Sequence, residues 1–162
     1  MRRDSLNLLS LKNIALVSFL ILYQVATSFF PLLSPLLGLF FTYGILIKER
    51  EVKSLKSLDL EKYFAISYVI FIELSKGFFL FSTILFYIFY YSMVVEWIKS
   101  TFKCRPCIVI IFVSSGYIGV LATNNLLAYI VNRPFFHFSF EYIVYIAIDS
   151  FLAILLFKDR IL

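Results

Sequence analysis

The sequence predicts an all-helical, polytopic membrane protein: a single integral-membrane domain, residues 1–162, with six short transmembrane helices. Of its residues, 62% are hydrophobic and 20% are aromatic, and the mean hydropathy is +0.93. A water-soluble domain of this size cannot hide so much apolar surface, whereas lipid can face it directly. The basic residues stand in short blocks between apolar runs. That pattern is typical of topology signals and of contact with anionic lipids, and it argues against a nucleic-acid-binding surface.

Two prolines divide the first two spans. A basic start is followed by an apolar run that carries no charge as far as Ile47. Pro31 and Pro35 interrupt this run, and proline lacks a backbone donor and clashes with the preceding helical turn. We therefore predict spans at about 14–30 and 32–47. The run continues past the one small-residue candidate for a cleavage site, which argues against a cleaved signal peptide.

The segment 48–62 is the most polar part of the chain, with five basic and four acidic residues. Val52, Leu55 and Leu58 recur at spacings of three, which fits an amphipathic helix lying on the lipid headgroups. A plain solvated loop fits the same composition. Both alternatives remain open at this point.

The stretch Tyr63–Val95 decides the topology, because Glu73 and Lys76 are its only charges. Read as a single helix, its 33 residues would measure about 50 Å, against a hydrocarbon core of about 30 Å. We therefore predict two helices, about 60–75 and 78–95, that meet at a turn outside the membrane. The many aromatic residues of the second helix are interpreted as lipid-facing.

Two further spans, about 107–131 and 135–157, complete the prediction, with a tight turn at Asn132–Pro134 between them. With six spans and a cytoplasmic N-terminus, 13 Lys and Arg residues lie inside and 2 lie outside. With one span at 63–95 the counts become 9 and 5, and Lys76 is buried. The positive-inside rule favours six spans, with both termini in the cytoplasm.

Asp149 is the clearest candidate for an intramembrane polar site. It lies about 12 Å from the cytoplasmic end of the last span at helical rise, and an ionisable group there costs at least about 2.5–3.5 kcal/mol. Side chains at similar depth on other spans are its expected partners: Gln24, Tyr87, Ser114 and Ser115. The interpretations are a packing clasp or a proton site facing the bundle interior, or a protonated Asp149 with no further role.

A second polar group is expected near the outer ends of the helices. It comprises Glu73, Lys76, Asn124, Asn125, Arg133 and Glu141. Glu73 and Lys76 stand three residues apart, so they are predicted to pair along one helical face. Small residues on the fifth span, Ser115, Gly116, Gly119 and Ala122, are expected to let another helix approach closely.

Cys104 and Cys107 form a C-x-x-C motif. The chain lacks the βαβ pattern of a thioredoxin-like redox domain, and two cysteines are half of a zinc ligand set. Their loop is predicted to face the reducing cytoplasm, so no disulfide is expected and the pair is interpreted as incidental. The sequence also carries no Walker, H-E-x-x-H or G-x-S-x-G motif. No catalytic, metal or cofactor residue is therefore assigned.

The layout resembles a bacterial family, the rod shape-determining protein MreD. The similarity lies in six short spans with both ends inside, a proline-marked first hairpin, and a third span that ends Ile72-Glu73-Leu74-Ser75-Lys76-Gly77. The family usually has Gly-Leu and then Asp in that span, where this chain has Phe71-Ile72 and then Glu73. The resemblance covers Asn13 to Arg160. It implies a non-enzymatic scaffold of the wall-elongation complex in the bacterial inner membrane.

The resemblance also implies a partner, a bitopic MreC-like protein. The family's fold is similar to the substrate-binding subunit of energy-coupling-factor vitamin transporters, which supplies the alternative of a small-molecule binding subunit. That alternative requires an outer cavity of about 300 Å³ or more, lined by Glu73, Asn124, Asn125 and Glu141. A scaffold instead predicts an outer half filled by Phe and Leu or covered by a partner helix.

Overall fold

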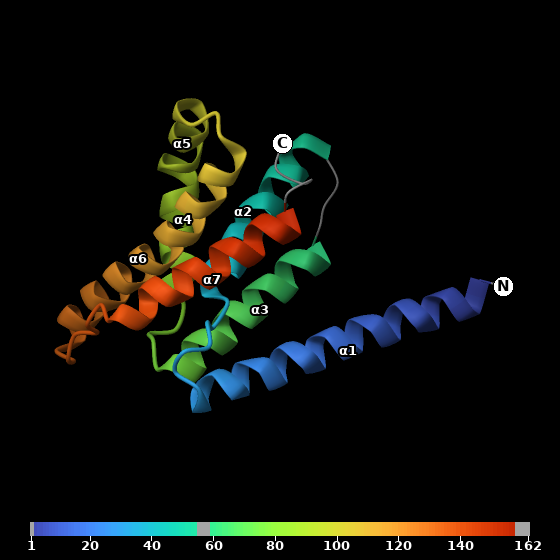
Figure 1. Ribbon diagram of the computed structural model, residues 1–162, viewed down its shortest axis with the longest axis horizontal. Coiled ribbons are helices and arrows are strands. Elements are labelled where there is room, and N and C mark those ends of the chain that lie inside the picture. Colours follow the sequence, from blue (N-terminus) through green and yellow to red (C-terminus); the bar gives the residue numbers. More distant parts are fainter. Residues whose placement is uncertain (1, 55–58, 158–162) are drawn as a thin grey trace.

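The computed structural model describes residues 2–54 and 59–157, and every regular element in these ranges is an α-helix (Figure 1). The helices are α1 (Arg2–Phe29), α2 (Leu37–Ser54), α3 (Asp59–Lys76), α4 (Ser82–Met93), α5 (Val95–Thr101), α6 (Arg105–Val131) and α7 (Phe140–Phe157). The predicted all-helical fold is confirmed. By length and composition, α6 and α7 could each cross a membrane, and Ile14–Phe29 of α1 is a shorter apolar stretch.

The predicted division of residues 63–95 into two helices is confirmed. Helix α3 ends at Lys76, and Gly77 takes a left-handed φ of 72°. The backbone N–H of Phe78 then donates to the carbonyl of Glu73 at 2.9 Å, which closes the helix end. Glycine adopts this conformation without the steric cost of a Cβ, so α3 ends just before Gly77.

Several helices begin at other residues than predicted. Helix α2 starts at Leu37 rather than at 32, because Pro31–Pro35 belongs to a turn. Helix α4 starts at Ser82 rather than at 78, and α7 at Phe140 rather than at 135. Residues 48–54 continue α2 instead of starting a separate surface helix. Leu55 and Leu58, which the amphipathic alternative also needs, lie outside the described residues.

Helix α6 lies at the centre of the bundle, in contact with α2, α4 and α7, and α2 also packs against α3 and α7. Helix α1 packs on α3 and diverges from the other helices toward its N-terminal end (Figure 1). The side chains of residues 14–19 in α1 are all exposed. The first helix is therefore the one least covered by its own chain.

The small-residue patch on α6 lets other helices approach closely at Gly116 and Gly119, as predicted, whereas Ala122 is exposed and takes no part. A Cβ at Gly119 would lie 1.9 Å from the Phe86 ring of α4, and one at Gly116 would lie 3.1 Å from the Phe41 ring of α2. The centroids of the Phe41 and Phe86 rings are 5.5 Å apart. The interpretation of the α4 aromatics as lipid-facing is therefore wrong for Phe86, and also for Tyr90, which is 4% exposed. The inward-facing Phe86 ring of α4 fits against α6 only because Gly119 has no side chain.

Candidate functional site

Asp149 of α7 is fully buried and accepts three hydrogen bonds. The Tyr117 hydroxyl of α6 donates to Oδ2 at 2.8 Å, and the backbone N–H of Leu39 in α2 donates to the same oxygen at 3.2 Å. The hydroxyl of Ser34, in the turn before α2, donates to Oδ1. One carboxyl group thus joins α2, α6, α7 and the turn between α1 and α2. Of the interpretations offered for Asp149, the packing clasp is the one that fits this arrangement.

The partners predicted for Asp149 are wrong. Ser114 and Ser115 donate to carbonyls of their own helix, at 2.8 and 2.9 Å. The hydroxyl of Tyr87 donates to a backbone carbonyl of α2 at 3.0 Å, and Gln24 Nε2 donates to a serine hydroxyl of α3 at 2.6 Å. A residue's depth along its own helix does not say which way that helix is rotated. The residues that contact Asp149 lie on faces that a depth count cannot identify.

Two residues absent from the predicted site, Ser34 and Tyr117, complete it. Their hydroxyl oxygens are 3.0 Å apart, and Ser34 Oγ also accepts the N–H of Leu36 at 3.2 Å. The carbonyl of Ser34 accepts a bond from the Tyr23 hydroxyl at 2.8 Å. The position of Ser34 between Pro31 and Pro35 could have indicated this role, because a serine just before a helix commonly accepts hydrogen bonds from the first free N–H groups.

Glu73 makes an equivalent arrangement at the start of α4. It is fully buried at the end of α3, and Oε1 accepts the N–H of Thr83 at 2.7 Å and the hydroxyl of Ser82 at 2.9 Å. Oε2 accepts the N–H of Phe81 at 2.8 Å. The first N–H groups of a helix have no partner within it and carry partial positive charge, so a carboxylate stabilises them. Glu73 is an N-terminal cap supplied by a neighbouring helix.

Both capped helices follow a residue with a left-handed backbone. Leu36, before α2, has φ of 58°, and Phe81, before α4, has φ of 68°. Neither side chain has an oxygen to cap the helix, and positive φ is strained for residues of this size. Asp149 and Glu73 replace the missing caps from other helices. The two carboxyl groups that the sequence singled out, Asp149 and Glu73, therefore hold the helix starts.

Lys76 does not pair with Glu73, so that prediction is wrong. The Lys76 ammonium donates to the carbonyl of Thr27 in α1 at 2.9 Å, while both Glu73 oxygens face α4. Three-residue spacing brings two side chains to one face, but the α4 N-terminus offers Glu73 more donors than one lysine. Together with Gln24, the Lys76 contact fastens the end of α1 to α3.

The remaining outer residues secure loops. Asn124 Oδ1 accepts the N–H of Phe79 at 2.8 Å, in the turn before α4. Asn125 exchanges two bonds with the backbone of Phe136, at 2.8 and 2.9 Å. The Arg133 guanidinium lies 5.5 Å from the centre of the Phe79 ring. The predicted outer group is thus divided among separate contacts.

An outer cavity of about 200 Å³ lies between these loops. It is lined by Lys76 and Glu141 together with tyrosines and prolines, and Glu141 is the one predicted ligand-binding residue among its lining residues. Glu73, Asn124 and Asn125 do not line it. This cavity is smaller than the roughly 300 Å³ that the small-molecule alternative requires.

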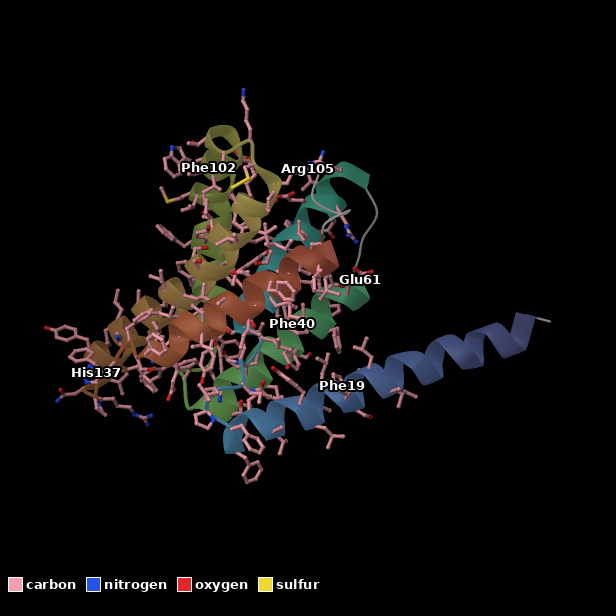
Figure 2. All side chains as sticks on the ribbon, in the orientation of Figure 1. Phe19, Phe40, Glu61, Phe102, Arg105 and His137 are labelled. Atoms are coloured by element: carbon pink, nitrogen blue, oxygen red, sulfur yellow. A yellow bond between two sulfur atoms is a disulfide. The ribbon has the colours of Figure 1, made fainter. Side chains whose placement is uncertain are left out.

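The expectation of two unpaired cysteines is wrong. Cys104 and Cys107 are joined by a disulfide, with Cα atoms 5.3 Å apart, at the start of α6 (Figure 2). Cys104 is the N-cap residue and Cys107 lies in the first turn, so the helix itself brings the two sulfurs together. His137 lies at the other end of the bundle from Arg105 (Figure 2). Among the described residues, no three His, Cys, Asp or Glu side chains cluster to hold a metal ion.

Comparison with protein-family models, with curated proteins and with solved structures finds no match to this chain.

Proposed function

We propose that this chain crosses the bacterial inner membrane six times and acts as a non-enzymatic scaffold of the cell-shape and wall-elongation complex, where it binds a single-span, MreC-like partner. The observation that carries the proposal is the use of the buried carboxyl groups. Asp149 and Glu73 are both committed to helix N-termini by backbone N–H donors. A catalytic carboxyl group needs a free oxygen facing a substrate, and each of these carboxyl oxygens already accepts a hydrogen bond from within the chain.

The cavity between the outer loops supports the scaffold over a vitamin-type binding subunit. The polar residues expected to line a ligand cavity are spread over separate loop contacts. Phe78 and Phe136 instead stack edge to face between the outer loops, with ring centroids 5.3 Å apart. An outer half occupied by phenylalanine is what the scaffold predicts.

Helix α1 offers the surface for the partner. It is fastened to α3 near its C-terminal end, through the Gln24–Ser75 and Lys76–Thr27 bonds. Residues 14–19 precede this contact, on the part of α1 that diverges from the other helices (Figure 1), and their side chains are exposed, with 66% of the Phe19 surface free. A single transmembrane helix from another chain can pack along this exposed stretch, because association in lipid depends on contact between helix surfaces.

Photo-crosslinking in the membrane tests this proposal. A photoreactive amino acid at Phe19 is expected to capture a co-expressed single-span partner with a coiled-coil domain. The same substitution at Leu155 on α7, which is 60% exposed, serves as the control and should capture none. Equal capture from both positions, or recovery of an ATPase pair in place of the single-span protein, would contradict the scaffold.

Labelling at Lys76 tests the topology separately. With six spans, a tag inserted there is reachable from the outside of intact cells. A tag that reacts only after the cytoplasmic side is opened would remove the basis for both the topology and the scaffold.

A further inference from the structure

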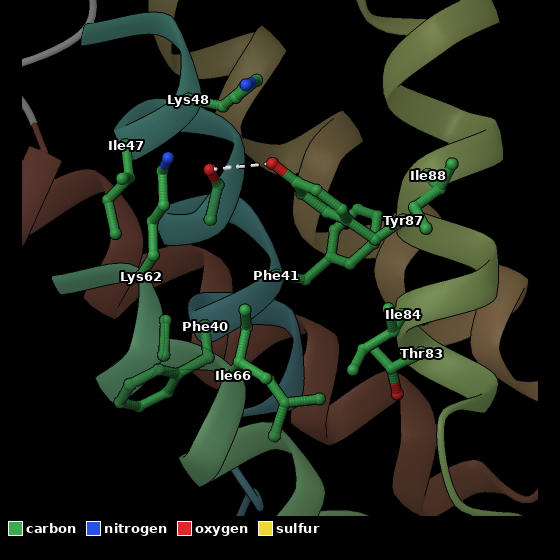
Figure 3. A pocket seen from close by; sticks show the side chains of 13 residues that line it. Phe40, Phe41, Ile47, Lys48, Lys62, Ile66, Thr83, Ile84, Tyr87 and Ile88 are labelled. Carbon is green, nitrogen blue, oxygen red and sulfur yellow. Dashed lines mark hydrogen bonds between the residues drawn. The ribbon is translucent and has the colours of Figure 1, made fainter. Parts of the chain in front are cut away.

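A groove lies between α2, α3 and α4, with a volume of about 350 Å³ (Figure 3). Helices α3 and α4 diverge from their connecting turn, and α2 closes the space behind them (Figure 1). Its walls are mainly aliphatic and aromatic, among them Phe40, Ile66 and Ile84. Lys48 and Lys62 stand at one end, and Thr83 stands at the other (Figure 3). The groove is therefore apolar along its length and cationic at one end.

Gly44 of α2 lines the groove, and its carbonyl accepts the Tyr87 hydroxyl at 3.0 Å (Figure 3). A Cβ at this position would lie 3.4 Å from the same ring. The tyrosine hydroxyl is thus directed to backbone, which leaves the aromatic ring to line the groove.

Among the described side chains, Lys48 and Lys62 share a single carboxylate at the cationic end of the groove. Glu51 pairs with Lys62 and lies 3.4 Å from Lys48, so one carboxylate serves two ammonium groups. The neighbouring Glu49 is paired with Lys99 of α5. A second anion bridging Lys48 and Lys62 would balance this end of the groove.

Glu61 does not supply that anion. It precedes Lys62 by one residue, so it lies about 100° around α3 from the lysine. Its carboxylate accepts a hydrogen bond from the Tyr43 hydroxyl at 3.1 Å.

We propose that the groove binds one acyl chain of an anionic phospholipid, whose phosphate lies between Lys48 and Lys62. From Lys62 to Val69 the groove runs about 10 Å at helical rise, along which an acyl chain buries methylene groups against apolar side chains. Basic side chains at headgroup level attract anionic lipids. The inference rests on the membrane location given under the proposed function, because the lysines must stand at the headgroups.

The charges favour a lipid over a partner helix, because the two lysines at one end of an otherwise apolar groove suit a phosphate headgroup above an acyl chain. A lipid chain also needs no hydrogen bonds from the walls. A helix resting across the mouth is an outcome that the experiment distinguishes.

Native mass spectrometry of the full chain tests the proposal. The chain is extracted in mild detergent and equilibrated with equal amounts of phosphatidylglycerol and phosphatidylcholine. We expect one retained phosphatidylglycerol per chain. Removing both lysines, with Lys48→Gln and Lys62→Gln, should lower retention by more than tenfold, since each lysine near a lipid surface contributes about fivefold. Lys53→Gln, an exposed lysine of α2 outside the groove, is the matched control and should have no effect.

Two further variants test the lipid site if the double lysine variant folds poorly. Glu51→Gln frees both ammonium groups and should raise phosphatidylglycerol retention. Ile66→Trp fills the groove and should lower retention of either lipid, whereas Leu74→Trp, on an exposed part of α3 outside the groove, should not. Equal retention of the two lipids, or no response to Glu51→Gln and Ile66→Trp, would overturn the lipid site.

The outcome separates this inference from the proposed function. A chain that extracts from membranes and captures its single-span partner, yet retains no phosphatidylglycerol, contradicts the lipid site alone. If another protein instead co-purifies with the chain and is released by Ile66→Trp, the groove belongs to a partner helix, and the lipid site is overturned. A chain that remains in the aqueous phase would contradict the membrane location and the lipid site together.

Discussion

The carboxylate of Asp149 on α7 accepts the backbone N–H of Leu39, in the first turn of α2, at 3.2 Å and 110 residues away along the chain. The start of α2 is therefore held by a residue near the end of the sequence. Glu73 holds the start of α4 in the same way, through the N–H of Thr83. Both helix starts depend on tertiary contacts, because their own preceding residues, Leu36 and Phe81, carry no capping group.

Asp149→Asn is expected to be tolerated, and Asp149→Leu is not. The asparagine oxygen can accept from Leu39 and Tyr117, while its amide donates to Ser34, whose hydroxyl is free to reverse. Leucine leaves the Leu39 N–H without a partner and should lower the free energy of unfolding by about 2–4 kcal/mol. Thermal unfolding in detergent measures the difference. Glu141→Leu, at an exposed carboxyl of the same helix, is the control, and equal stability of all three variants would show that the cap is idle.

Glu73→Gln should behave differently from Asp149→Asn. Each Glu73 oxygen accepts a backbone N–H, from Phe81 and from Thr83, and a backbone donor cannot reverse. The glutamine amide would face one of these donors, so we expect a loss of about 1–3 kcal/mol. The same thermal unfolding measurement compares the two conservative variants. A glutamine variant as stable as the wild type would contradict the two-donor geometry.

Gly119→Ala should disturb the contact between α4 and α6. The added methyl group would lie 1.9 Å from the Phe86 ring, so the ring must move in a packed interior, at a cost of about 1–3 kcal/mol. Combining Gly119→Ala with Phe86→Leu should recover part of this loss. Ala122→Leu, on an exposed face of α6, is the control. Additive losses in the double variant would count against a direct clash.

The cysteine pair provides a test of topology. The positive-inside count assigns the Cys104–Cys107 loop to the cytoplasm, where thiols are kept reduced. The disulfide in the structure is the oxidised form of the pair. The proposed topology predicts the reduced form in living cells, so both cysteines should react there with a membrane-permeant alkylating reagent, and the disulfide should form on oxidation after extraction. A mass shift on gels measures the number of blocked thiols. A pair already protected in cells would place this end of the bundle on the oxidising side.

Glu51 gives a pH dependence outside the predicted spans. The hydrogen bond from Lys62 lowers the pKa of the Glu51 carboxyl below its ordinary value. A carboxyl with a lowered native pKa stabilises the fold above its unfolded pKa, and this contribution is lost as the pH falls through the native value. Wild type should therefore exceed Glu51→Gln in melting temperature at pH 7, and the gap should close at acidic pH. Glu96→Gln, at an exposed carboxyl, should show no such gap.

The turn after Lys76 could be predicted, whereas the partners of Asp149 could not. Gly77 and the length of the apolar stretch are local signals, and they located the break between α3 and α4. The same local reasoning placed Ser114 and Tyr87 near Asp149 by depth alone. Helix rotation depends on packing between distant segments, such as Phe86 against Gly119, and no single segment encodes it.

The sequence by itself determined an all-helical chain, the positions of its main breaks, and Asp149 and Glu73 as residues that need partners. These follow from the chain's own apolar runs, prolines and glycine, which act within a few residues. Only the tertiary structure decided that the two carboxylates cap α2 and α4, that Cys104 and Cys107 are joined, and that α3 and α4 diverge into a groove. The reason is that an N-terminal N–H group accepts any well-placed oxygen, and the fold alone chooses which residue brings one.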